Sequence, residues 1–168
     1  MSTVSIRPIR RGDRAGIERL LSRASEFTLV EIACALELVD GSLEHGNSDE
    51  DYAVFCAESP ERGIIGFVCY GKTPLTQATY DLYWIAIDPS HRRGGMGRRM
   101  LHYLENILNA KGAKLLVAET SSLSAYAQAR SFYTREGFLE ESRIRDFYAS
   151  GDDLLIYCKR LQRGAGTN

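Results

Sequence analysis

The chain has 168 residues, of which 44% are hydrophobic and 26% are charged, a composition typical of one globular domain with a sizeable core. The formal net charge of −1 provides no basic surface overall, so we expect no nucleic acid as a partner. No apolar run approaches the roughly 18 residues of a membrane-spanning helix, and the first residues lack the apolar segment of a secretory signal, so we expect no membrane partner.

The first part of the chain predicts a strand followed by two helices. Residues 4–8 are typical of a short strand, and Asp13 is placed to cap a helix in which apolar side chains recur at helical spacing. Thr28 and Glu31 have the Thr-x-x-Glu spacing of a capping box. This box predicts the start of a second helix, which we expect to run through about Val39.

The middle of the chain predicts three strands and a long helix. The apolar segments 52–58 and 64–70 are separated by a turn that contains Pro and Gly, which indicates a hairpin. Residues 80–88 are rich in aromatic and β-branched side chains and predict a third strand. From Gly95 the apolar positions follow helical spacing, and Gly112 is placed to end this helix.

The last part predicts strand, helix and two strands. Residues 113–119 form an apolar strand segment, and a helix is expected around 125–135, ending at Gly137. Two further strands are expected near 138–147 and 153–161, joined by a turn.

These elements predict the α/β (α+β) class: a mixed, mostly antiparallel central sheet of about seven strands with helices on both faces. We expect a single domain over residues 1–162 and a disordered tail over 163–168. Four cysteines show no CxxC spacing, and we interpret them as buried thiols in a reducing cytoplasm, with no metal site; they are Cys34, Cys56, Cys69 and Cys158.

A glycine cluster lies between the strand 80–88 and the following helix, within "HRRGGMGRRM". The first N–H groups of a helix lack intrahelical acceptors, and the helix dipole adds partial positive charge there. Glycines let the backbone approach an anion closely, and four arginines surround this point: Arg92, Arg93, Arg98 and Arg99. The pattern favours an anion site, although a tight turn beside solvated arginines would have the same sequence.

The cluster departs from two known nucleotide-binding patterns. The P-loop pattern is absent. From Gly95 the chain reads G-x-G-x-x-M, which lacks the third glycine of the dinucleotide fingerprint, although Glu119 ends the next strand. Too few residues follow Glu119 for a doubly wound sheet, so a small dinucleotide-binding protein stays an alternative of lower rank.

Two segments resemble a known family. "RRGGMG" (residues 92–97) is similar to the [QR]-x-x-G-x-[GA] motif of the GNAT superfamily of acetyl-CoA-dependent N-acetyltransferases, and "ARSFYTREGF" (residues 129–138) is similar to its later motif A-x-x-F/L-Y-x-x-x-G-F. The order of strands and helices also matches. The resemblance implies a GNAT-like acyl-CoA N-acyltransferase fold and acetyl-CoA as co-substrate.

The resemblance implies a cofactor site on the glycine cluster. Backbone amides there would bind the pyrophosphate, and the end of the preceding strand would bond to the pantetheine arm. Arg130 could reach a phosphate, although an exposed helix arginine is the alternative. The implied residues are Ile85, Ala86, Ile87, Arg92, Arg93, Gly94, Gly95, Met96, Gly97, Arg98 and Arg130.

Three catalytic candidates follow from the same resemblance. Tyr133 aligns with a tyrosine that protonates the departing thiolate, and a phenol with a pKa of about 10 is a reasonable acid for a thiol. Asp81 aligns with a carboxylate base that is usually Glu, and Glu119 lies where other members place their base. Each also has a structural alternative: Tyr133 as a packed ring, Asp81 as a polar strand start, and Glu119 as an ion-pair partner.

The expected function is transfer of an acetyl group from acetyl-CoA to a primary amine of a small molecule or peptide, by direct attack with a carboxylate base and a tyrosine acid. The alternative is a protein that senses acyl-CoA without turnover. The aromatic C-terminal hairpin, with Phe147, Tyr148 and Tyr157, suggests a homodimer.

Overall fold

Seven strands of residues 3–161, the part of the chain that the computed structural model describes, form one mixed sheet in the order β1-β2-β3-β4-β5-β7-β6. The strands are β1 (Ser5–Pro8), β2 (Ala53–Ser59), β3 (Gly63–Lys72), β4 (Thr79–Ile87), β5 (Leu115–Ser121), β6 (Leu139–Ala149) and β7 (Asp152–Arg160). The α-helices are α1 (Arg14–Arg23), α2 (Leu29–Glu44), α3 (Met96–Ala110) and α4 (Ala127–Arg135). This architecture confirms the predicted fold class, while the predicted tail over 163–168 lies outside the described residues.

The chain divides into two compact units. The first comprises the described residues through Lys72 together with Tyr83–Asn106, and the second comprises Thr73–Leu82 and the described residues from Ile107 onward. Both β4 and α3 therefore contribute residues to each unit. The single domain that we expect over 1–162 stays a prediction.

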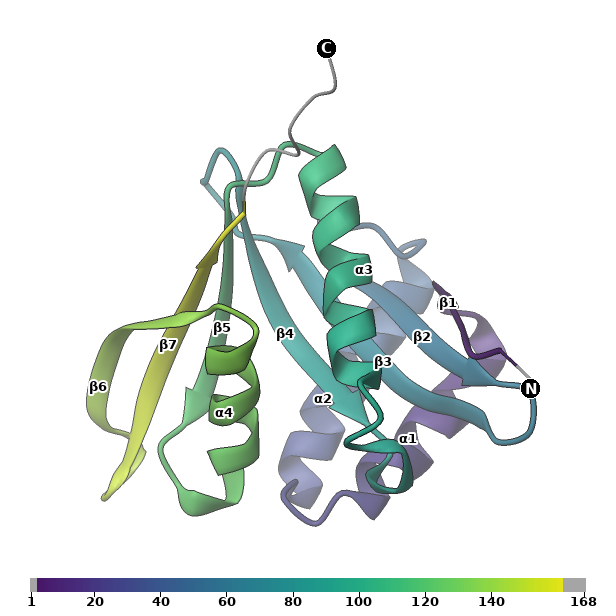
Figure 1. Cartoon of the computed structure of the whole chain (residues 1–168), viewed down its shortest axis with the longest axis horizontal. Coiled ribbons are helices and arrows are strands. Elements are labelled where there is room, and N and C mark those ends of the chain that lie inside the picture. Colours follow the sequence, from purple (N-terminus) through teal and green to yellow (C-terminus); the bar gives the residue numbers. More distant parts are fainter. Residues whose placement is uncertain (1–2, 162–168) are drawn as a thin grey trace. The chain divides into compact units, whose positions relative to one another are not determined.

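The first unit has helices on both faces of its strands, because successive side chains of a strand point to opposite faces. On β3, Phe67 and Cys69 belong to the hydrophobic core that α1 and α2 complete. Gly66 faces the other way, where an added Cβ would lie 2.9 Å from the sulfur of Met100 on α3. Figure 1 shows α3 in front of β2 and β3, with α1 and α2 behind them. The absence of a side chain at Gly66 thus lets α3 pack closely.

The capping box of α2 forms as predicted. The N–H of Thr28 donates to Glu31 Oε2 at 2.7 Å, and the N–H of Glu31 donates to Thr28 Oγ1 at 3.3 Å. The helix runs beyond the expected end at Val39 to Glu44. Burial of Val39 and of the side chain at Ser42 accompanies this extension, so packing outweighs the low helix propensity of Gly41.

In the second unit, β5 pairs in parallel with the first half of β4 and antiparallel with β7, and β6 forms the edge. All of β6 is exposed. Its pairing with β7 is interrupted: the register jumps from Ile144 opposite Leu154 to Ala149 opposite Asp152. Asp146, inside the interruption, has a φ of +52°. The hairpin therefore carries a bulge that displays its aromatic side chains.

The cysteines are free thiols in different surroundings. Cys56 and Cys69 are fully buried, and burial raises the pKa of each thiol to about 12, so both behave as small hydrophobic side chains. Cys34 is exposed, and the prediction of burial is wrong for it because it lies on the solvent side of α2. Among residues 3–161, no helix has both the length and the apolar character needed to cross a bilayer.

Asp13 does not cap α1 as predicted, because its carboxylate has other partners. It accepts hydrogen bonds from the guanidinium of Arg7 at 2.6 and 2.9 Å and from the N–H of Arg10 at 2.7 Å. Arg7 also donates to Glu58 at 2.7 Å. The side chains of Arg7 and Asp13 are only 12% and 10% exposed, so this largely buried cluster ties the start of α1 to β1 and β2.

We predict that Asp13→Asn lowers the free energy of unfolding by roughly 2–4 kcal/mol at pH 7, because it leaves Arg7 buried without its main partner. Burial raises the pKa of Asp13, but hydrogen bonds from Arg7 and Arg10 outweigh it and hold the pKa below its ordinary value. Its contribution is therefore present above about pH 4 and is lost as the pH falls through the lowered pKa.

Urea unfolding between pH 7 and pH 2.5 measures both effects. The matched control is Asp40→Asn, which removes the half-exposed ion pair with Arg14 and should cost less than about 1 kcal/mol. Equal losses in the two variants, or an unchanged acid slope in Asp13→Asn, would contradict the assignment.

Candidate functional site

The loop between β4 and α3 presents the first amides of α3. The N–H of Arg99 donates to the carbonyl of Gly95 at 3.0 Å, so Gly95 is the residue that precedes the helix. Gly95 has a φ of +76°, a conformation that side chains with a Cβ rarely adopt. Since the N–H groups of the next three residues have no acceptor within the helix, they are directed out of its N-terminus. The sequence folds this way because a glycine stands where the backbone must turn.

A buried carboxylate organises the start of the loop. Asp88 accepts hydrogen bonds from the N–H of Ser90 at 2.9 Å and from its hydroxyl at 2.5 Å, and it pairs with Arg23 of α1 at 2.8 Å. Burial raises the pKa of Asp88, but the bonds from Ser90 and the charge of Arg23 outweigh it and hold the pKa below its ordinary value. The carboxylate therefore stays ionised at neutral pH and fixes the turn that follows β4.

The side chain of Arg92 is engaged within the first unit. Its Nε donates to the carbonyl of Ile87 at 3.1 Å, and its guanidinium pairs with Glu26, which lies between α1 and α2. Arg92 can therefore offer a ligand its backbone, because its side chain is already engaged. Sequence reasoning did not predict the ion pairs of Glu26 and Arg23, whose partners lie more than 60 positions away, whereas the Asp-Pro pair at Asp88 is a recognisable turn signal.

The loop fits a diphosphate group. A Cβ built on Gly95 would meet no atom within 4 Å, so the space beside its backbone is open. Arg93 and Arg98 are exposed on either side. A helix N-terminus with open amides and nearby guanidinium groups is a set of donors that suits a phosphate. Gly94, Met96 and Gly97 complete the predicted segment.

The end of β4 carries the other predicted cofactor residues. The parallel pairing of β4 with β5 runs from Thr79 opposite Leu115 to Leu82 opposite Ala118, whereas β4 continues to Ile87. In this continuation Ala86 is buried, and Ile85 and Ile87 are half-buried. The predicted bonds between this backbone and a pantetheine arm stay a prediction.

Tyr133, in the second unit, is fixed by the end of α4. Gly137, with a φ of +87°, lets the N–H of Phe138 donate to the carbonyl of Tyr133 at 2.9 Å, the closing bond of a Schellman motif. The ring of Tyr133 lies 5.2 Å from that of Phe138 and 5.7 Å from that of Tyr157. Burial raises the pKa of Tyr133 to about 12, so the phenol keeps its proton at physiological pH.

The two candidate bases share a face of the sheet. Asp81 lies opposite Val117 in the parallel register, and Glu119 is two residues further along β5, so both side chains point to the same side. Asp81 is half-buried and accepts a hydrogen bond from the hydroxyl of Thr73 at 2.8 Å. Glu119 is exposed. Asp81 thus also has a structural partner, and Glu119 is open to solvent.

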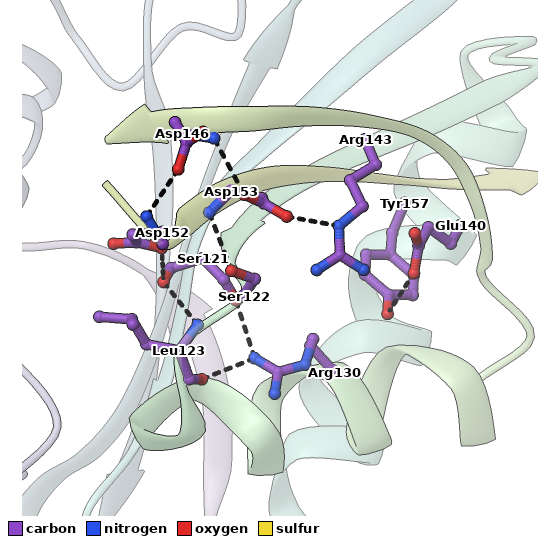
Figure 2. A network of polar contacts seen from close by, with 11 residues as sticks. Ser121, Ser122, Leu123, Arg130, Glu140, Arg143, Asp146, Asp152, Asp153 and Tyr157 are labelled. Atoms are coloured by element: carbon purple, nitrogen blue, oxygen red, sulfur yellow. Dashed lines mark hydrogen bonds and ion pairs between the residues drawn. The ribbon is translucent and has the colours of Figure 1, made fainter. Parts of the chain in front are cut away.

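A polar network occupies the end of β5, where the sequence reads Thr-Ser-Ser (Figure 2). The hydroxyl of Ser121 pairs with Asp152 and accepts a hydrogen bond from the N–H of Leu123 at 3.0 Å. The N–H of Asp153 donates to the hydroxyl of Ser122 at 2.8 Å. Two adjacent serines therefore join the turn after β5 to the start of β7, and sequence reasoning missed their role.

Arg130 belongs to this network. Its Nη1 donates to the carbonyls of Ser121 and Leu123, each at 2.8 Å, and Figure 2 shows the guanidinium reaching toward that turn. These bonds support the structural reading of Arg130, and its predicted phosphate contact stays a prediction. Beside it, one face of α4 lines an open hollow, with Ala127, Arg130, Ser131, Thr134 and Arg135 at helical spacing. Within residues 3–161, His, Cys, Asp and Glu form no cluster suited to a metal ion.

Comparison with known proteins identifies the class. A model of the GNAT acetyltransferase domain matches residues 50–140, more than half of the chain. The [ribosomal protein bS18]-alanine N-acetyltransferase of Escherichia coli K12 is 31% identical over 106 residues, which are 63% of this chain and 68% of that protein. The matches define an N-acetyltransferase. The chain belongs to the GNAT family, which confirms the predicted family and removes the dinucleotide-binding alternative.

Solved structures agree with this assignment. A protein from Desulfovibrio desulfuricans described as a GNAT-family acetyltransferase has a TM-score of 0.88 at 37% identity, covering 95% of this chain and 100% of that chain. The yncA protein of Salmonella typhimurium, solved with its cofactor acetyl-CoA, has a TM-score of 0.71 at 19% identity, covering 99% of both chains. The second similarity shows the fold alone.

We predict that Gly95→Val weakens binding of coenzyme A at least tenfold. A β-branched residue is strained at a φ of +76°, and its side chain would enter the open space beside the amides. Isothermal titration calorimetry with coenzyme A measures the loss. Gly46→Val is the matched control: Gly46 has a φ of +80° in the segment after α2, also with open space around it. Equal affinities in the two variants would contradict the placement.

Proposed function

We propose that this chain transfers the acetyl group of acetyl-CoA to a primary amine by direct attack, with no covalent enzyme intermediate. The observation that carries the proposal is the loop before α3, where Gly95 opens a helix N-terminus toward solvent between exposed arginines. In this proposal the amides from Arg92 to Gly97, with Arg98, bind the pyrophosphate. The backbone of residues 85–87 binds the pantetheine arm.

The reaction needs three contributions from the protein: a base for the amine, hydrogen-bond donors for the oxyanion, and an acid for the departing thiolate. The ammonium group of the acceptor gives a proton to a carboxylate, for which Asp81 and Glu119 are the candidates. The amine nitrogen then bonds to the thioester carbon, and the oxyanion that forms accepts hydrogen bonds, for which a free N–H near Ile85 and Ile87 would serve. The carbon–sulfur bond breaks, the thiolate takes up a proton, and the nitrogen gives up its second proton, which restores the acid that protonated the sulfur. Tyr133 is the proposed donor to this sulfur.

Burial of Tyr133 refines its role. A thiol has a pKa near 8.5, so a phenol with a pKa of about 12 would give up its proton against a gap of roughly 3 units, or about 4–5 kcal/mol. The phenol is therefore best suited to stabilise the developing thiolate by donating a hydrogen bond, with complete proton transfer coming late in the reaction. It also remains protonated at the alkaline pH at which the amine is most reactive.

The acceptor is a primary amine of a peptide or a small molecule. The E. coli relative is named for the alanine of ribosomal protein bS18, which supports a peptide N-terminus as the first acceptor to test. An aminoglycoside 6′-N-acetyltransferase with bound coenzyme A shares only the fold, at 13% identity, so it supports no particular small molecule. A cytoplasmic location and a homodimer through the C-terminal hairpin also belong to this proposal.

The function is tested by release of free thiol from acetyl-CoA in the presence of amines. The panel comprises a peptide with an N-terminal alanine, the same peptide with an acetylated N-terminus and an internal lysine, a polyamine and an aminoglycoside. We expect amine-dependent release with at least one of them. Tight acetyl-CoA binding without release from any amine would instead identify a sensor of acyl-CoA.

We predict that Tyr133→Phe lowers kcat by about 10²–10⁴-fold while coenzyme A affinity and unfolding free energy change little, because only the hydroxyl is lost. The control is Tyr157→Phe, which removes the hydroxyl of the neighbouring ring and should leave kcat within about threefold. Because burial raises the pKa of Tyr133 to about 12, the wild-type rate should show no loss from this group below about pH 11.

Rate profiles from pH 6 to pH 10.5 for the three proteins give the measurement. A decline near pH 9–10 that is present in the wild type and absent in Tyr133→Phe would contradict the raised pKa. Parallel losses of kcat and stability in Tyr133→Phe would show that the hydroxyl is structural.

A further inference from the structure

The glycine loop is held by a segment that lies outside both sequence motifs. This segment, residues 23–27, comprises the end of α1 and the turn before α2. Arg23 pairs with Asp88 at 2.8 Å, and Glu26 pairs with Arg92. All four residues belong to the first unit. The segment therefore makes two ion pairs with the loop, one at each side of the turn after β4.

The pair between Glu26 and Arg92 is largely shielded from water. The side chains of Arg92 and Glu26 are 29% and 21% exposed. Phe27, the next residue, packs edge-on against Trp84 of β4 with ring centroids 5.4 Å apart, which fixes the backbone beside Glu26. An ion pair with this degree of burial and a fixed backbone on one side is more than a transient surface contact.

Arg92 connects this pair to the loop through a third group. Its Nε donates to the carbonyl of Ile87, the last residue of β4, while the same guanidinium holds Glu26. The guanidinium thus bridges the end of the strand and the segment before α2. Since the amides of the loop must stay open to bind an anion, side-chain contacts of this kind are the means by which the loop can keep its shape.

We propose that Glu26 is a positioning residue for the pyrophosphate of acetyl-CoA: through Arg92 it holds the glycine loop in its binding conformation. This inference rests on the proposed function, in which the loop binds the cofactor. The expected change in coenzyme A affinity is opposite to the one that charge repulsion alone would give. A carboxylate close to an anion site repels the anion, so removing its charge should strengthen binding if electrostatics alone mattered. Positioning requires that the same change weakens binding.

The first experiment compares Glu26→Gln with Glu37→Gln by calorimetry with coenzyme A. Glu37 is exposed on α2, and its substitution removes the same charge. We expect Glu26→Gln to bind coenzyme A about five- to twentyfold more weakly, and Glu37→Gln to stay within twofold of the wild type. Glu26→Asp, which keeps the charge on a shorter side chain, should recover part of the loss.

The second experiment separates positioning from general destabilisation. S-acetyl-pantetheine carries the same thioester but lacks the pyrophosphate and the nucleotide. In Glu26→Gln, kcat/KM should fall several-fold more for acetyl-CoA than for S-acetyl-pantetheine. Arg92→Gln should reproduce the weaker coenzyme A binding, and the double variant should be no worse than Arg92→Gln alone, because both changes break the same ion pair.

Three results would overturn the inference. They are coenzyme A affinity in Glu26→Gln equal to or above that of the wild type, equal losses with the two acetyl donors, and additive losses in the double variant. If Glu26→Gln does not fold, Glu26→Asp and Arg92→Gln decide, by the same comparison of kcat/KM between acetyl-CoA and S-acetyl-pantetheine. Failure of the wild-type chain to bind coenzyme A is a separate outcome, because it overturns the proposed function itself.

Discussion

A loop that binds an anion through its own N–H groups cannot use those groups to hold itself together. In the proposed function, this constraint applies to the segment before α3. Gly95 sets the direction of the chain without a side chain, and Asp88 and Arg92 support the segment on either side, together with the N–H of His91, which donates to the carbonyl of Asp88 at 2.8 Å. We therefore infer that these ion pairs help to hold the backbone of the segment in shape.

In the second unit the relation is reversed: the backbone at the end of a helix positions a side chain. The Schellman motif after α4 requires Gly137, and it brings Phe138 against the ring of Tyr133. One backbone motif thus fixes the place of the phenol and supplies part of the apolar wall that raises its pKa. A substitution at Gly137 would alter both the geometry and the acidity of Tyr133.

Local patterns predicted most of the fold. Helical spacing, the capping box at Thr28 and the terminal glycines predicted the start of α2 and both ends of α3 and α4 to within a few residues, because short-range contacts decide these features. The extension of α2 to Glu44 was not predictable from propensity, because it depends on burial against other elements.

The glycine motif likewise located the loop, because the backbone conformation at Gly95 depends on the residue itself. The supports of the loop could not be predicted in this way. Arg23 and Asp88 are 65 positions apart, Glu26 and Arg92 are 66 apart, and no spacing rule relates charges at such separations. Arg130, by contrast, was predicted as a site residue but has structural partners. It was selected for its charge, yet its donors are directed to two carbonyls of the neighbouring turn.

The interruption in β6 has a consequence for behaviour in concentrated solution. An exposed edge strand is a template on which other chains can add strands, and such addition leads to aggregation. Here the register with β7 breaks after Ile144, and Asp146 turns into the left-handed region, so a straight run of edge amides ends there. On the β6 edge, a second copy could extend the sheet along Leu139–Ile144 but not past the interruption, which limits strand-by-strand growth at this edge. The bulge thus disfavours fibril-like addition at the β6 edge while Phe147 and Tyr148 remain exposed.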